Sequence, residues 1–132
     1  MSLFKNIFGS SDEENLNSRR KLDWVAFEHI DQLDMIIQNS WQKPVLIFKH
    51  STRCIISKTA LSSFENEFHY EDKITLYFLD LLKYRTISNE VAETFVITHQ
   101  SPQILLIKNG IVIYDASHES IDATFLERFV NE

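Results

Sequence analysis

The sequence predicts an α/β sandwich, in which a mixed β-sheet lies between two layers of helices. Two observations predict this class. From residue 23 to about residue 100, short apolar runs alternate with stretches whose apolar residues recur at helical spacing. Near the C-terminus an Asn-Gly pair separates two apolar runs, which is the strongest short-range signal for a hairpin. The 132 residues, 44% of them hydrophobic, suffice for one domain with its own core.

The first part of this pattern predicts a strand, a helix and a second strand. The run 24–27 is β-branched and aromatic, which is typical of a strand. A helix follows, and helical spacing predicts its buried side: Ile30, Leu33, Ile36 and Ile37. Pro44 prevents this helix from running further. The continuous apolar run 45–48 then predicts a strand that is covered on both faces.

The middle of the chain repeats the alternation. A helix is expected over about 54–68, where one apolar stripe recurs: Ile56, Ala60, Phe64 and Phe68. The run 74–79 predicts the third strand. Ser88 or Asn89 can cap the next helix, which carries its apolar residues on one side: Val91, Ala92 and Phe95.

The C-terminal part predicts a hairpin and a last helix. The runs 104–107 and 111–114 flank 108–110 and form the hairpin. Asp122 is the expected N-cap of the helix, with Ile121 placed to pack on Leu126. The helix continues its buried stripe with three residues: Phe125, Phe129 and Val130.

These elements combine into one topology. The three strands connected by helices should be parallel, because right-handed crossovers return the chain to the same direction. The hairpin adds antiparallel strands, and helices cover both faces, as in a three-layer sandwich of the thioredoxin kind. Residues 1–20 are expected to be a flexible arm with an acidic linker, and residues 21–132 to be the folded domain.

Composition disfavours several classes of protein. The net charge of −6 argues against binding nucleic acid or anionic membranes. One cysteine cannot form an internal disulfide, and the histidines show no zinc-ligand spacing. No run approaches the ~18 apolar residues of a membrane span, so we expect a cytoplasmic protein without one. Trp24 and Trp41 are expected in the core rather than on a nucleic-acid surface.

Cys54 is the residue where chemistry is most strongly indicated. It stands at the expected start of a helix, where free backbone N–H groups and the helix dipole favour a thiolate. Arg53 beside it adds positive charge, as do three further residues: Lys49, His50 and Lys58. Ser57 lies one helical turn away and could donate a hydrogen bond to the sulfur. The opposing interpretation is a buried, unreactive cysteine that acts as a small hydrophobic residue.

Four segments resemble the thioredoxin-like proteins of the bacillithiol system, the YtxJ-like or monothiol bacilliredoxin family. One segment resembles the family's active-site stretch: Phe48-Lys49-His50-Ser51-Thr52-Arg53-Cys54, with Ser57. A second resembles the start of the family's third helix: Arg85-Thr86-Ile87-Ser88-Asn89. A third resembles the family's cis-proline segment, His99-Gln100-Ser101-Pro102-Gln103, and a fourth the turn before the last helix, Ala116-Ser117-His118 with Ile121.

The resemblance implies a monothiol thiol–disulfide oxidoreductase with Cys54 as nucleophile, supported by Arg53 and Ser57. It would act on mixed disulfides between client proteins and bacillithiol, with bacillithiol as co-substrate and with neither a metal nor a tightly bound cofactor. Pro102 would be cis and face Cys54 across the site. The implied substrate contacts are His50, Thr52, Ser101 and Pro102.

One position departs from the family. The family usually has proline directly after the cysteine, whereas this chain has Ile55, so the redox potential cannot be carried over. Two other functions remain open: a redox-inert adaptor with the same fold, and a stress-responsive thiol sensor. The chain is expected to be a monomer.

Overall fold

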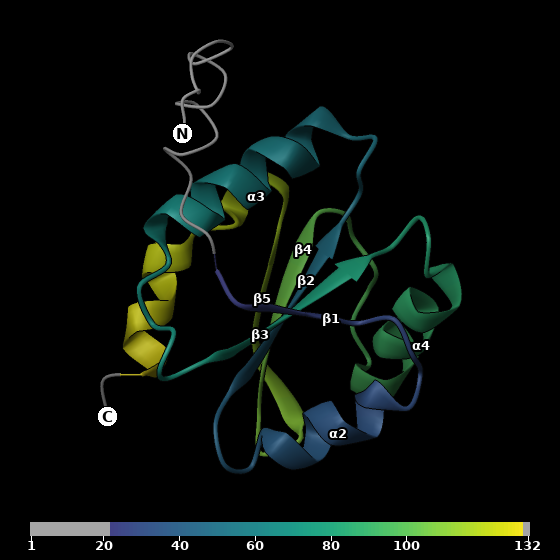
Figure 1. The fold of residues 1–132 in the computed structure, drawn as a ribbon, viewed down its shortest axis with the longest axis vertical. Coiled ribbons are helices and arrows are strands. Elements are labelled where there is room, and N and C mark those ends of the chain that lie inside the picture. The colour runs from purple at the N-terminus through teal and green to yellow at the C-terminus, as the bar shows by residue number, and fades with distance from the viewer. Residues whose placement is uncertain (1–21, 131–132) are drawn as a thin grey trace, which may run out of the picture.

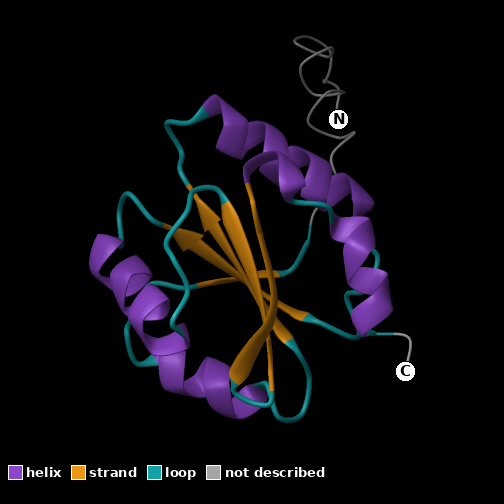
Figure 2. Cartoon of the chain, turned by 180° about the vertical axis from the view of Figure 1, so that it is seen from behind, coloured by secondary structure: helices purple, strands orange, loops and turns teal. Residues whose placement is uncertain are grey.

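The structure is a computed structural model that describes residues 22–130, in which a five-stranded sheet lies between helices (Figures 1 and 2). The expected arm at residues 1–20 lies outside the described residues. The elements in chain order are β1 (Trp24–Ala26), α2 (Gln32–Asn39), β2 (Val45–His50), α3 (Ile55–Glu67), β3 (Thr75–Asp80), α4 (Arg85–Phe95), β4 (Gln103–Lys108), β5 (Ile111–Ser117), η1 (His118–Ser120) and η2 (Ala123–Phe129), where η1 and η2 are 3₁₀ helices.

The sheet has the strand order β1-β3-β2-β4-β5. Strand β3 pairs in parallel with both β1 and β2, whereas β4 pairs antiparallel with β2 and β5 antiparallel with β4. The predicted mixed sheet, with three parallel strands and a C-terminal hairpin, is therefore confirmed. All six residues of β2 are buried, as its continuous apolar run predicted.

The core consists of two layers, one on each face of the sheet. One layer includes Phe48 of β2 and Phe64 of α3, together with Leu126 of η2. The other includes Ile47 of β2 and packs under α2 and α4, where Val91 is fully buried. Neighbouring residues of β2 thus enter opposite layers, because side chains alternate along a strand. The same alternation decides which layer each polar residue at the end of β2 enters.

The hairpin turn confirms the sequence prediction. Asn109 and Gly110 connect β4 to β5 with φ angles of 55° and 80°, the left-handed backbone that a two-residue turn of this kind requires. A Cβ atom at Gly110 would lie 3.4 Å from Nε1 of Trp41. The register shifts once along the hairpin, between Leu106 and Ile107.

Three expectations about single elements are wrong. Helix α4 begins at Arg85 rather than after Ser88 or Asn89, because the N–H of Ser88 already donates to the carbonyl of Tyr84. Ile30 precedes α2 and is exposed. Trp41 lies outside the core with 63% of its surface exposed, since it follows α2 in the turn that leads to β2.

The last helical segment matches its predicted start. The carboxylate of Asp122 accepts a hydrogen bond from the N–H of Thr124 at 2.9 Å, as an N-cap does. Ile121 and Leu126 are buried in the same core layer. Phe125 is half-buried rather than buried and stacks on Tyr114 with ring centroids 4.8 Å apart. Of the helices in residues 22–130, none has the length and apolar character needed to cross a membrane.

Candidate active site

Cys54 is the N-cap residue of α3, directly after the loop that leaves β2. Its N–H donates to the carbonyl of Ser51 at 3.2 Å, and its own carbonyl accepts the N–H of Lys58 at 3.0 Å. The side chain is half-buried rather than enclosed. The thiol therefore stands at the helix N-terminus, as predicted, where unpaired N–H groups and the helix dipole favour a negative charge.

The hydroxyl of Ser57 is buried under this loop. Its oxygen accepts the N–H of Ser51 at 2.9 Å and lies 2.7 Å from Nδ1 of His50. Within residues 22–130 no hydrogen bond joins this hydroxyl to the sulfur of Cys54, so the expected direct contact is not formed in this arrangement. Ser57 instead ties the active-site loop to the end of β2.

Thr52 and Arg53 are exposed on the other side of the loop. Both line an open pocket of about 400 Å³, whose remaining walls are Asp80, Leu82 and Lys83. Two of these five side chains are cationic, and the carboxylate of Asp80 accepts the N–H groups of Leu82 and Lys83. The pocket therefore offers an anionic ligand Arg53 and Lys83 next to the cysteine loop.

Lys49 does not contribute to this positive surface, contrary to the sequence interpretation. Its side chain is fully buried on the α4 side of the sheet. The ammonium donates to the carbonyl of Ser88 at 3.2 Å and lies 3.1 Å from Nδ1 of His99. Burial lowers the pKa of Lys49 from 10.5 to about 8.

The same cluster disfavours the protonated form of His99. Burial first, and then the charges of Lys49 and Arg85, hold the pKa of His99 below its usual value. Because the ammonium of Lys49 donates to Nδ1, the proton of the neutral ring is left on Nε2. The histidine next to the proline segment is thus a donor at Nε2.

The peptide bond between Ser101 and Pro102 is cis, as the resemblance implied. Gln103 pairs with Lys49 at the last position of the antiparallel ladder between β4 and β2. The residues before Gln103 and those after Lys49 therefore leave the same end of the sheet, which brings the Ser101-Pro102 segment to the cysteine loop. The carbonyl of Pro102 accepts the N–H of His118 at 3.0 Å.

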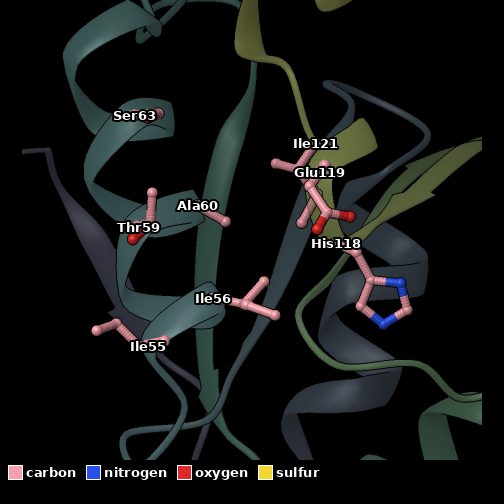
Figure 3. A pocket seen from close by; sticks show the side chains of 8 residues that line it. All are labelled: Ile55, Ile56, Thr59, Ala60, Ser63, His118, Glu119 and Ile121. Atoms are coloured by element: carbon pink, nitrogen blue, oxygen red, sulfur yellow. The ribbon is translucent and has the colours of Figure 1, made fainter.

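A second pocket of about 390 Å³ lies on the α3 side of the cysteine loop (Figure 3). Figure 3 shows Ile56 of α3 and His118 of η1 on opposite sides of it. Ile55, in the position where the family usually has proline, is 79% exposed. Ile56 was expected in the core but forms a wall of this pocket, because helical periodicity does not distinguish a core from a groove.

A thiol at the start of a helix, with a cis-proline at the same end of the sheet, defines the class of thioredoxin-like thiol redox proteins. A solved structure described provisionally as an oxidoreductase with a thioredoxin fold is 31% identical, with a TM-score of 0.68, over 79% of this chain and 90% of that one. Within this class, the chain belongs to the monothiol bacilliredoxin family: its family model, monothiol bacilliredoxin BrxC, matches residues 25–126.

Two thioredoxins share the fold at lower identity. Thioredoxin from Malassezia sympodialis is 21% identical, with a TM-score of 0.64, over 84% of this chain and 90% of that chain. Mitochondrial thioredoxin 3 from Saccharomyces cerevisiae is 16% identical, with a TM-score of 0.61, over 81% and 92%. These two thioredoxins show the fold, whereas the family match and the structure that is 31% identical place the protein in thiol redox chemistry with thiol partners.

Proposed function

We propose that the protein removes bacillithiol from mixed disulfides with client proteins by thiol–disulfide exchange at Cys54. One observation carries this proposal: the chain's single cysteine stands half-buried at the N-terminus of α3, in the segment matched by the family model. A thiolate in such a position can attack a disulfide sulfur.

The reaction would proceed in two exchanges. The Cys54 thiolate attacks the bacillithiol sulfur of the mixed disulfide, so that a bond between Cys54 and bacillithiol forms and the client leaves as a thiolate that takes up a proton. A second bacillithiol thiolate then attacks the bacillithiol sulfur bound to Cys54. This step releases bacillithiol disulfide and regenerates the Cys54 thiolate. The scheme needs no second cysteine, and the chain has none.

The surroundings of Cys54 support different roles for the remaining site residues. Arg53 and Lys83, in the pocket that Thr52 also lines, would bind the carboxylates of bacillithiol. The main chain of Ser101, beside the cis-proline, would pair with an extended segment of the client.

The test is mass spectrometry of the full-length protein after incubation with a bacillithiolated client. We expect a mass gain of one bacillithiol at Cys54 together with release of the free client thiol. Cys54→Ser should show neither change, and equal turnover by this variant would refute the assignment. A glutathionylated client is the control for specificity: equal rates on both substrates would leave a thiol redox role but exclude a preference for bacillithiol.

An inert cysteine would give a different result. If Cys54 neither exchanges with the mixed disulfide nor reacts with iodoacetamide at neutral pH, the protein is a redox-inert adaptor. Stoichiometric labelling of Cys54 without release of further client thiol would instead indicate a sensor.

A further inference from the structure

The end of β2 holds a buried pair that the exchange reaction itself does not require. His50 is 5% exposed and Ser57 is fully buried, and the two side chains meet with 2.7 Å between Nδ1 and Oγ. The same oxygen accepts the N–H of Ser51 at 2.9 Å. Because β2 and α3 both hold this pair, its geometry is fixed by the fold.

Counting hydrogens shows that this pair has two states. A serine hydroxyl has one hydrogen and two lone pairs, and the N–H of Ser51 occupies one lone pair. In the first state the hydroxyl donates to an unprotonated Nδ1 of His50 and has no hydrogen left for another acceptor. In the second state Nδ1 carries a proton, as it always does in the imidazolium and as it does in one of the two neutral tautomers, and it donates to the second lone pair, so the hydroxyl hydrogen of Ser57 is free.

The sulfur of Cys54 is the candidate acceptor for the free hydrogen. Cys54 is the N-cap of α3 and Ser57 is its third helical residue, the spacing at which an N-cap side chain can turn back toward the first turn of the helix. The side chain of Cys54 does not cap the helix in the present arrangement. For the sulfur to accept this hydrogen, the side chain of Cys54 must rotate about its Cα–Cβ bond toward Ser57. A hydrogen bond to a thiolate stabilises the charged form.

We propose that His50 is a positioning residue: its proton on Nδ1 directs the hydroxyl of Ser57 to the Cys54 thiolate. Protonation of His50 and ionisation of Cys54 therefore favour each other. The inference rests on the proposed function only in taking Cys54 as the reactive group.

Other titratable groups surround His50 and bear on the same equilibrium. Asp80 is its register partner on β3, and His118 of η1 donates its N–H to the carbonyl of the neighbouring Pro102. Lys49 precedes it on β2 but points to the opposite face of the sheet. Tests must therefore separate coupling through Ser57 from coupling through these charges.

The first test measures the rate at which iodoacetamide alkylates Cys54 from pH 5 to pH 9, with no client present. Ser57→Ala should slow alkylation near pH 6.5 by about tenfold, since it removes the hydrogen bond to the thiolate. His50→Phe should do the same in the wild-type background and have no further effect in Ser57→Ala. His50→Asn places an amide N–H near the position of Nδ1, so it should keep the rate of Cys54 alkylation within about twofold of the wild-type rate. Because asparagine does not titrate, the part of the pH dependence that comes from protonation of His50 should disappear. Additive effects of His50→Phe and Ser57→Ala would overturn the proposal.

The second test needs no substitution in the buried pair. The imidazole of His50 is titrated by nitrogen NMR in the full-length protein before and after Cys54 is alkylated. Because the coupling is reciprocal, loss of the thiolate should move the His50 titration to lower pH. An unchanged titration would refute the coupling. Neither test uses a mixed disulfide, so a failure of client turnover and a failure of this coupling give distinguishable results.

Discussion

Lys49 shows how a single residue in an active-site motif can serve the fold rather than the reaction. It lies one residue before His50, yet its amine is buried on the opposite face of the sheet with two hydrogen-bonding partners, Ser88 and His99. Sequence reasoning placed it among the charges around Cys54 because it counted distance along the chain. Alternation along β2 separates the two residues by the full thickness of the sheet.

The lowered pKa of Lys49 predicts a pH dependence of stability. The folded chain binds this proton less tightly, with a pKa of about 8, than an unfolded chain with the ordinary 10.5. Between these two pKa values the unfolded state therefore binds more protons at Lys49 than the folded state does. The contribution of Lys49 to the free energy of unfolding rises with pH through this window and is lowest below pH 8. We expect the difference in unfolding free energy, wild type minus Lys49→Met, to increase by about 2–3 kcal/mol from pH 7 to pH 10 in urea titrations.

The matched control is Lys58→Met, which removes an exposed lysine from α3. Its stability difference from wild type should stay within about 0.5 kcal/mol across the same range. If the free energy of unfolding of the wild type and of Lys49→Met changed with pH in the same way, Lys49 would have the same pKa in the folded protein as in the unfolded chain.

At the scale of elements, the hairpin turn was predicted because its cause is local. Asn109 and Gly110 need left-handed backbone, and the sequence supplies the residue types that adopt it. The start of α4 was not predicted, because a serine can cap a helix or lie inside one. Tertiary contacts place Ser88 inside the helix: it is buried, and its carbonyl accepts a hydrogen bond from the ammonium of Lys49.

Substitution of Gly110 tests the turn. Gly110→Ala should reduce the free energy of unfolding by about 1–2 kcal/mol, because a φ of 80° is strained for a residue with a Cβ atom. The added methyl group would also lie 3.4 Å from Trp41. Asn109→Gly is the control, since glycine adopts the φ of 55° found there, and its stability should change by less than about 0.5 kcal/mol. Equal effects of the two substitutions would contradict the assignment of strain to Gly110.

At the scale of the whole molecule, the sheet separates two independent packing layers. Phe64 belongs to the layer under α3, and Val91 to the layer under α4. Phe64→Leu and Val91→Ala should each cost about 1–2 kcal/mol in urea unfolding. Because the two sites share no partners, their costs should add to within about 0.5 kcal/mol in the double variant.

A pair within one layer provides the comparison. Phe64 and Phe68 stack with ring centroids 5.3 Å apart, so Phe64→Leu and Phe68→Leu should deviate from additivity by more than about 0.5 kcal/mol. Strong coupling between Phe64 and Val91 would show that the sheet transmits packing changes from one face to the other.

The global arrangement could be predicted because continuous apolar runs mark the strands and helical spacing marks the helices, and the handedness of crossovers then leaves few topologies. The position of Cys54 could be predicted for the same reason. The contact between His50 and Ser57 could not, since it depends on how closely α3 packs against β2. The exposed position of Ile56 in a pocket wall had no distinguishing signal either.

The outer strand β5 has one neighbouring strand, β4, in the described sheet, so its other side carries backbone groups that a foreign strand could join. Leu106 pairs with Tyr114 and Ile107 with Val112, which leaves Ile113 as an extra residue in β5. Such an extra residue bends and twists an edge strand, and a bent edge strand is a poor template for pairing with a strand of another molecule. This irregularity therefore disfavours pairing of β5, a seven-residue edge strand, with a strand of another molecule.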